Sequence, residues 1–309
     1  MSPLNKKGKR LSRAQVLRAL GALVAVLATT MNAAVAVRGE GSPAVALRGL
    51  GLSFAAGAGR RTILANIDLD VREGEFLCIV GASGSGKTSL LRILAGLIRP
   101  THGEARFRGQ AISGPSRERA IVFQDYSRAL LPWRTVSANV ALGLDSRGVR
   151  REAQPPIVEE LLVRMGLADA SAQYPSQLSG GMQQRVQIAR CLAQAPQILL
   201  MDEPFGALDA LTRQALQDEI LFLTAEKQIT VVFITHDLEE AIYLGDRVVV
   251  LGGSPGGIVE TVDVDLPRPR NQLTTREDAR FLAHRHRLFR VLAAETNIGR
   301  VTAAPRGAQ

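Results

Sequence analysis

The sequence predicts an α/β protein built on a mostly parallel β-sheet. From about residue 45 onward, short apolar runs alternate with segments of helical spacing, which is the pattern of a layered α/β fold. The runs are continuous rather than alternating in polarity, as expected of strands buried on both faces of a parallel sheet. They are EFLCIV (75–80), AIVF (120–123), QILLM (197–201), TVVFIT (230–235) and RVVVL (247–251).

The N-terminal 40 residues differ in composition from the rest. Residues 1–18 carry six Lys and Arg and no acid, and an uncharged stretch, 19–37, follows them. This order is typical of a signal peptide or of a single membrane span, although Thr29, Thr30 and Asn32 interrupt the stretch. We expect a disordered leader or a true translation start at Met31, with a membrane anchor as the open alternative. Residues 1–40 are therefore treated as an extension.

Two later segments have helical patterns only. Between 125 and 178 the strand patterns give way to ones such as IVEELLVRMGL (157–167), which predicts a helical subdomain of about 125–195 inserted in the α/β core. At the C-terminus, REDARFLAHRHRLFRVLAAE (276–295) predicts an amphipathic helix with Phe281, Leu288 and Leu292 on one face. The expected organisation is an extension 1–40, a domain 41–265 with this helical insertion, and a basic helical tail 266–309.

The composition excludes a disordered chain, since 46% of residues are hydrophobic and 22% are charged. Cys78 and Cys191 have neither metal-ligand spacing nor the density of a disulfide framework, which favours a reducing compartment. Of the net charge of +9, the segments 1–18 and 266–309 contribute +6 each, so residues 19–265 carry −3. We expect no nucleic-acid partner. The basic tail is interpreted as a solvated helix face, with a regulatory or membrane-surface element as the alternative.

A glycine-rich sequence follows the first continuous apolar run. GASGSGKT (81–88) lies after a predicted strand and opens the helical pattern 87–97, which is the context of a phosphate-binding loop. Its glycines let backbone N–H groups converge on phosphate oxygens, and the helix N-terminus adds a positive field. A P-loop NTPase is predicted, with Lys87 on the β- and γ-phosphates and the Thr88 hydroxyl on Mg²⁺. The expected nucleotide-binding residues are Gly81, Ala82, Ser83, Gly84, Ser85, Gly86, Lys87, Thr88 and Ser89.

Two adjacent acids end another apolar run. In ILLMDEP (198–204), Asp202 is placed to bind Mg²⁺ through water and Glu203 to polarise an attacking water. Two acids at a strand end can also be only a helix-start signal. The phosphate-binding loop upstream favours the catalytic interpretation.

The third motif is LSGGMQQR (178–185). With the other two motifs in this order, the chain resembles the ATP-binding subunits of ABC transporters over residues 45 to about 295. The resemblance implies a RecA-like P-loop core with a mostly parallel sheet, an antiparallel β subdomain and an inserted α-helical signature subdomain. It also implies ATP and Mg²⁺ as cofactors.

The resemblance assigns further roles residue by residue. It implies that Phe54 stacks on adenine, that Gln124 contacts Mg²⁺ and the water, that Asp209 signals across a dimer, and that His236 contacts the γ-phosphate. Each residue alone has a simpler interpretation. Phe54 could be a core aromatic, Gln124 a polar strand end, Asp209 a helix cap and His236 an exposed turn residue. Their joint occurrence at the family positions favours the functional roles.

The signature motif predicts a homodimer. Ser179 and the N–H groups of Gly180 and Gly181 open a helix and can bind an anion, although the phosphate-binding loop already accommodates the chain's own ATP. We therefore expect the motif to bind the γ-phosphate held by a second copy, with two ATP molecules between head-to-tail subunits. Met182 replaces the glutamine that is usual in the signature and is not expected to touch phosphate.

Finer features resemble one importer branch. LLPWRTVSANVALGL (130–144) and VDVDLPRPR (262–270) are similar to the nitrate, sulfonate and taurine uptake group, whereas SPGGI (254–258) departs from it. The resemblance implies import of a nitrate, aliphatic sulfonate or taurine-like solute, with a pyrimidine thiamine precursor as the alternative. It implies two membrane permease subunits, an indirect solute-binding protein, and a peripheral location on the cytoplasmic face of the bacterial inner membrane. A soluble, non-transport ABC ATPase is the third interpretation.

Overall fold

The computed structural model describes residues 42–57, 59–126 and 129–301, with side chains described as far as Glu295. The elements considered below belong to one compact unit that spans Gly41–Leu266 and resumes at Arg270. Within the described residues, no helix combines the length and apolar character that a membrane crossing requires. The expected N-terminal extension, including the stretch 19–37 and Met31, lies outside the described residues.

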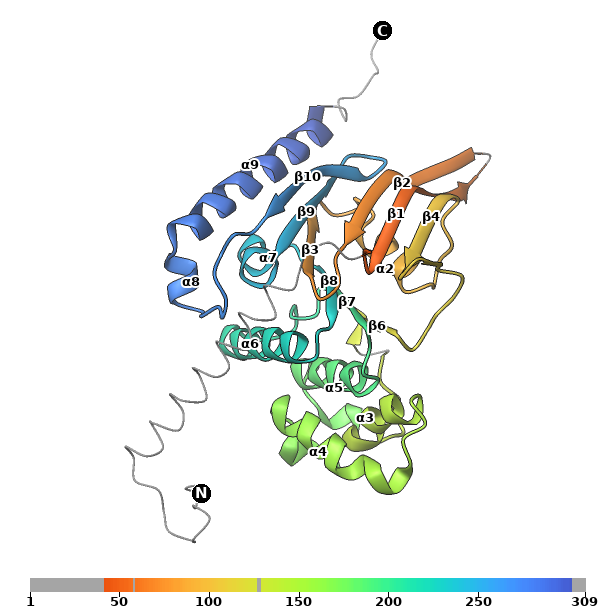
Figure 1. Cartoon of the computed structure of the whole chain (residues 1–309), viewed down its shortest axis with the longest axis vertical. Coiled ribbons are helices and arrows are strands. Elements are labelled where there is room, and N and C mark those ends of the chain that lie inside the picture. The colour runs from red at the N-terminus through yellow and green to blue at the C-terminus, as the bar shows by residue number, and fades with distance from the viewer. Residues whose placement is uncertain (1–41, 58, 127–128, 302–309) are drawn as a thin grey trace. The chain divides into compact units, whose positions relative to one another are not determined.

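A six-stranded sheet forms the centre of this unit (Figure 1). Its strand order is β10-β9-β3-β8-β7-β6, and every pair is parallel except β10 with β9. The predicted apolar runs all enter this sheet, which confirms the expected fold class. Its strands are β3 (Phe76–Gly81), β6 (Arg119–Val122), β7 (Ile198–Asp202), β8 (Thr230–Ile234), β9 (Arg247–Gly252) and β10 (Gly257–Asp263).

The second sheet is antiparallel and has four strands in the order β2-β1-β4-β5. Figure 1 shows it beside the central sheet, with helix α2 close to both. Its presence confirms the antiparallel β subdomain. The elements are β1 (Val45–Ala56), β2 (Gly59–Val71), β4 (His102–Phe107), β5 (Gln110–Ala111) and α2 (Lys87–Leu94).

The two faces of β3 belong to two different hydrophobic cores, because successive side chains of a strand point to opposite faces. Leu77 and Ile79 pack with the antiparallel sheet and α2. Phe76, Cys78 and Val80 pack with the helices on the other face. Both cores therefore hold β3 in place, and the phosphate-binding loop follows directly from its end.

The segment between β6 and β7 is helical. α5 contacts β6, and α3 and α4 both contact α5, so these helices extend away from the central sheet as Figure 1 shows. Thr135 begins α3 as an N-cap by accepting a hydrogen bond from the Ala138 backbone N–H. The helices are α3 (Val136–Asp145), α4 (Gln154–Arg164) and α5 (Gly180–Ala193).

The remaining helices cover the sheet on the side of the larger core. α7 packs against β3 and β9, and the C-terminal helix α9 packs against α7 and β9. Phe281 and Leu288 of α9 are fully buried and Leu292 is half-buried, as the periodicity predicts. The elements are α6 (Ala210–Glu226), α7 (Leu238–Leu244), α8 (Thr274–Glu277) and α9 (Ala279–Val301). The expected domain boundaries near residues 40 and 265 stay predictions.

A buried ion pair connects the start of β9 to the turn before β3. The Arg247 guanidinium donates to both carboxylate oxygens of Glu75, at 2.8 and 3.0 Å, and only 2% of Glu75 is exposed. The Arg72 backbone N–H donates to the same carboxylate at 2.7 Å. The ion pair thus links the N-terminal ends of β3 and β9 in the central sheet.

We predict that Glu75→Gln lowers the free energy of unfolding by about 3 kcal/mol, because it leaves the half-buried Arg247 charge uncompensated. Urea denaturation monitored by circular dichroism measures the change. Glu73→Gln is the matched control, since Glu73 pairs with Arg108 at the surface and such pairs contribute at most about 1 kcal/mol. Equal losses in the two variants would contradict the structural role of the buried pair.

Candidate functional site

The candidate phosphate-binding loop connects β3 to α2. Gly84 and Gly86 have φ angles of +83° and +92°, a region that L side chains adopt only with strain. Lys87, the first residue of α2, is 9% exposed, and its Nζ donates to the carbonyls of Gly81 at 2.8 Å and Ala82 at 2.9 Å. Burial lowers the pKa of the Lys87 ammonium, against the opposing effect of nearby acids. The Lys87 side chain thus connects the end of the loop to its first two residues.

The loop contains a buried hydroxyl with spare hydrogen-bonding capacity. Ser85 is 2% exposed, and its Oγ has no hydrogen-bond partner among the described residues. Buried polar groups are normally satisfied, so such a group is consistent with a site that a polar ligand completes.

The turn after β9, the parallel neighbour of β3, packs against the loop. A Cβ at Gly256 would lie 2.0 Å from the Ser85 carbonyl oxygen and 3.3 Å from the Ile63 carbonyl oxygen. The Gly256 backbone also donates to Ile63 at 2.8 Å and accepts from Ala65 at 3.0 Å. The turn between β9 and β10 therefore packs backbone to backbone against the loop, and only glycine fits.

Asp202 ends β7 beside the first turn of α2. It is 6% exposed; burial raises the pKa of its carboxyl, whereas a hydrogen bond with Thr88 lowers it. Asp202, Thr88 and Gln124 line a common cavity of about 430 Å³. Carboxylate, hydroxyl and amide oxygens are the donors that hard divalent cations prefer.

Glu203 follows Asp202 with a left-handed backbone, at a φ of +45°. Such a conformation costs a non-glycine residue on the order of 1–3 kcal/mol and is common at functional sites. Its Oε2 accepts from Gln124 Nε2 at 3.3 Å and lies 3.1 Å from His236 Nδ1. The Glu203 side chain is 23% exposed and that of His236 is 73% exposed, so the group is open to solvent. Three predicted catalytic residues from three strand ends thus meet at one carboxylate oxygen.

The signature residues begin α5. Ser179 is the N-cap, and its Oγ accepts from the Met182 backbone N–H at 3.3 Å. A Cβ at Gly180 would lie 2.5 Å from the Tyr126 hydroxyl, and one at Gly181 would lie 2.8 Å from Leu208 Cδ2. The glycines therefore also have an intrachain role, which is to let α5 approach its neighbours.

Asp209 and Phe54 occupy exposed positions. Asp209 is the N-cap of α6 and accepts from the Thr212 backbone N–H at 3.0 Å; hydrogen bonds with Thr212 lower its carboxyl pKa. Phe54 lies in β1 opposite Arg61, and 45% of its surface is exposed, so it is not a core aromatic.

The predicted site residues fall into two groups. The structure brings one group to the strand ends of one sheet: Lys87, Thr88, Asp202, Glu203, Gln124 and His236. The other group lies on other elements: Phe54, Ser179, Gly180, Gly181 and Asp209.

Comparisons with known proteins identify the family. A family model described as ABC transporter matches residues 64–206. An uncharacterised ABC transporter ATP-binding protein of Methanocaldococcus jannaschii is 49% identical over 232 residues, which cover 75% of this chain and 85% of that protein. The chain belongs to the ABC transporter ATP-binding proteins. It is accordingly an ATP-binding ATPase coupled to transport.

Other relatives and a solved structure agree with this membership. A nitrate transport protein of Klebsiella oxytoca is 42% identical over 258 residues, covering 81% of this ABC protein and 96% of the relative. A bicarbonate transport ATP-binding protein of Synechococcus elongatus is 46% identical, and the match spans 35% of that longer protein. A dimeric ATP-binding cassette in a post-hydrolysis state with ADP and Pi is 32% identical, with a TM-score of 0.65 over 71% of this chain and 98% of that one.

Three residues near the site have no motif that marks them. Gly256 supports the phosphate-binding loop, and Tyr126 packs on the signature helix. The side-chain amide of Gln187 on α5 pairs with the backbone of Phe123, just before Gln124, at 2.7 and 3.2 Å. Gly256 lies in SPGGI (254–258), but that segment differs from the importer group in the residue after Pro-Gly and not at Gly256 itself.

We predict that Gly256→Ala raises the Kd for ATP about tenfold, because the new methyl group must displace the Ser85 backbone and close-packed interiors resist such insertions. Titration with a fluorescent ATP analogue measures the affinity. Gly114→Ala is the control, since nothing lies within 4 Å of a Cβ at that position. Wild-type affinity in a folded Gly256→Ala variant would show that the loop does not depend on this contact.

Proposed function

We propose that this protein is the ATP-hydrolysing subunit of an ABC importer for small anionic solutes, and that it hydrolyses ATP as a homodimer. The observation that carries the catalytic part is the convergence of Gln124 and His236 on the Glu203 carboxylate, beside a phosphate-binding loop. The transport part is supported by the similarity to the nitrate transport protein along nearly its whole length.

ATP binding is assigned to the loop 81–89. Its backbone N–H groups and the start of α2 provide positive field for phosphate oxygens, and the desolvated Lys87 ammonium adds a charge that is weakly hydrated. The exposed Phe54 ring is available to stack on adenine.

The Mg²⁺ that accompanies ATP fits the oxygen donors gathered at the cavity of Thr88, Gln124 and Asp202. Bound there, the ion would neutralise charge on the β- and γ-phosphates. Thr88 lowers the carboxyl pKa of Asp202 against the effect of burial, and both side chains line the same cavity, as the proposed ligand roles require.

Hydrolysis needs a water aligned with the γ-phosphate and a group that accepts its proton. Glu203 is proposed as the base, since its carboxylate is partly exposed and contacts Gln124 and His236. His236 and Gln124 hold that carboxylate from two sides and are proposed to contact the γ-phosphate and the water, respectively.

The second anion site supports the dimer. The capped N-terminus of α5, with Ser179, Gly180 and Gly181, is proposed to bind the γ-phosphate of a second copy, and Asp209 to signal across the interface. The structural neighbour described above is itself dimeric. Loss of the shared phosphate on hydrolysis would loosen the interface and convert the reaction into movement.

Two membrane permease subunits are the proposed partners, and a solute-binding protein is a proposed indirect partner. This protein itself is proposed to lie peripherally on the cytoplasmic face of the bacterial inner membrane. Trp133, in a loop held by the buried Asn139, is 70% exposed, and exposed aromatics of this kind are enriched at protein interfaces. Nitrate is favoured among the nitrate, sulfonate and taurine-like solutes, because relatives named for nitrate and bicarbonate transport both act on small oxyanions.

We predict that Glu203→Gln retains ATP binding and loses at least about 99% of ATP turnover, since general-base removal typically costs 10²–10⁴-fold. With ATP present, the trapped variant should elute as a dimer in size-exclusion chromatography. Glu118→Gln, which changes a half-buried carboxylate that accepts a hydrogen bond from Ser116 outside the site, should retain wild-type turnover. Turnover at the wild-type rate in Glu203→Gln would reject Glu203 as the base.

A further inference from the structure

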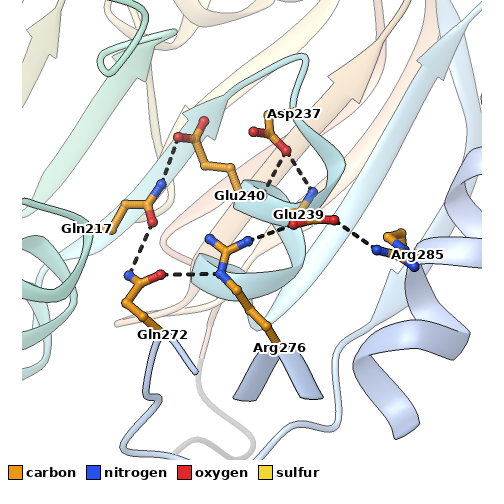
Figure 2. Close-up of polar contacts among 7 residues, drawn as sticks. All are labelled: Gln217, Asp237, Glu239, Glu240, Gln272, Arg276 and Arg285. Carbon is orange, nitrogen blue, oxygen red and sulfur yellow. Dashed lines mark hydrogen bonds and ion pairs between the residues drawn. The ribbon is translucent and has the colours of Figure 1, made fainter. Parts of the chain in front are cut away.

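The C-terminal segment Arg270–Arg285, here called the C-terminal strap, contacts the helix that follows His236. Figure 2 shows the side chains involved: Gln272, Arg276 and Arg285 from the strap, with Glu239 and Glu240 on α7 and Gln217 on α6. The sequence suggested a solvated basic face for this region. Arg287 and Arg290 of α9 are indeed exposed, whereas Arg270, Arg276 and Arg285 contact α7.

Glu239 is the main point of attachment. Its Oε2 accepts from Arg276 Nη1 and its Oε1 from Arg285 Nη1, each at 2.9 Å. The two arginines come from different helices, α8 and α9, so both carboxylate oxygens are engaged from two directions. The Arg276 guanidinium also lies 5.2 Å from the ring centroid of Tyr243 on α7, in a cation–π contact.

The other end of α7 is held by the same segment. Arg270 Nη1 donates to the carbonyls of Ile242 at 2.7 Å and Tyr243 at 2.5 Å. These carbonyls belong to the last turn of the helix, where a cation is favourable. The strap thus contacts both the first and the last turn of a helix of only seven residues.

The contacts close into a ring that includes α6. The buried Glu240 accepts from Gln217 Nε2 at 2.9 Å, and Gln217 in turn accepts from Gln272 Nε2 at 3.3 Å. Gln272 then accepts from Arg276 Nε at 3.3 Å, and Arg276 returns to α7 through Glu239. Because the ring starts and ends on adjacent residues of α7, rotation or sliding of that helix breaks several of these bonds together.

α7 is coupled directly to His236. Asp237 caps the helix by accepting from the backbone N–H groups of Glu239 at 2.9 Å and Glu240 at 3.2 Å. The Asp237 backbone N–H donates to Thr235 Oγ1 at 3.0 Å. His236 lies between these two residues, and its exposed ring places Nδ1 3.1 Å from Glu203 Oε2.

We propose that the C-terminal strap, through Arg276 and Arg285 on Glu239, fixes α7 and thereby positions His236 against Glu203. Both arginines are then positioning residues for ATP hydrolysis, and neither contacts the reacting atoms. This inference rests on the role proposed above for His236, but the position of the ring can be measured independently of activity.

The test uses the full-length protein with Arg276→Gln and Arg285→Gln combined. The chain has four histidines, so the ring resonances of His236 can be assigned by their loss in His236→Ala. We expect the His236 resonances to shift in the double variant while those of the distant His102 stay in place. We also expect kcat for ATP to fall about tenfold with KM within about twofold, since small misplacements of catalytic groups act mainly on turnover.

Arg287→Gln is the matched control. Arg287 lies on the same helix as Arg285, is 52% exposed and pairs with Glu260 on β10. Arg287→Gln removes one positive charge from the same helix without touching α7, and should leave both the His236 resonances and kcat unchanged. Glu239→Gln weakens both arginine contacts at that carboxylate and should produce a defect of the same kind. The triple variant should be no worse than the double variant, because the double variant already lacks both charged partners of Glu239.

Unchanged His236 resonances in a folded Arg276→Gln/Arg285→Gln variant would overturn the proposal, as would an equal loss of kcat in Arg287→Gln. Shifted resonances with unchanged kcat would support the strap and instead contradict the catalytic role of His236. The two readouts therefore distinguish the positioning role of the strap from the catalytic role of His236.

Discussion

The contact between the Glu203 carboxylate and its two neighbours depends on the parallel sheet. Parallel strands bring their carboxyl ends to one edge, and here β6, β7 and β8 present Gln124, Glu203 and His236 in adjacent positions at that edge. β3 lies next to β8 and places Lys87 at the same edge. The two consecutive acids have different neighbours, Thr88 for Asp202 and His236 for Glu203. The sheet order therefore determines which side chains can cooperate.

The supporting contacts lie outside the motifs. Gly256 supports the phosphate-binding loop from the β9–β10 turn, Gln187 holds the backbone next to Gln124, and the C-terminal strap holds the helix next to His236. Each of these connects a site residue to an element that is distant in sequence. The proposed site is thus supported by α5, by the β9–β10 hairpin and by α8 and α9 together. A displacement of any of these elements would shift residues of the site.

Much of the fold could be predicted from the sequence, because strands buried on both faces leave continuous apolar runs and helices leave a period. The motif residues could be located for a similar reason, since loop glycines, a lysine and paired acids have fixed local spacing. Gly256 and Arg276 could not be assigned this way. The constraint on Gly256 is the Ser85 carbonyl, 171 positions earlier in the chain, and the direction of Arg276 depends on Glu239. Periodicity predicts that α9 has a buried face but not which helix that face contacts.

The central claim is that each ATP site is composed of the phosphate-binding loop of one copy and the signature residues of another. A mixing experiment tests it most directly. Lys87→Ala removes the loop side, and Ser179→Arg blocks the signature side, so either variant alone should be inactive in ATP hydrolysis. A mixed dimer contains one intact site, and equal mixing should restore about a quarter of wild-type turnover on statistical grounds. Absence of recovery, together with wild-type turnover by Ser179→Arg alone, would contradict the account.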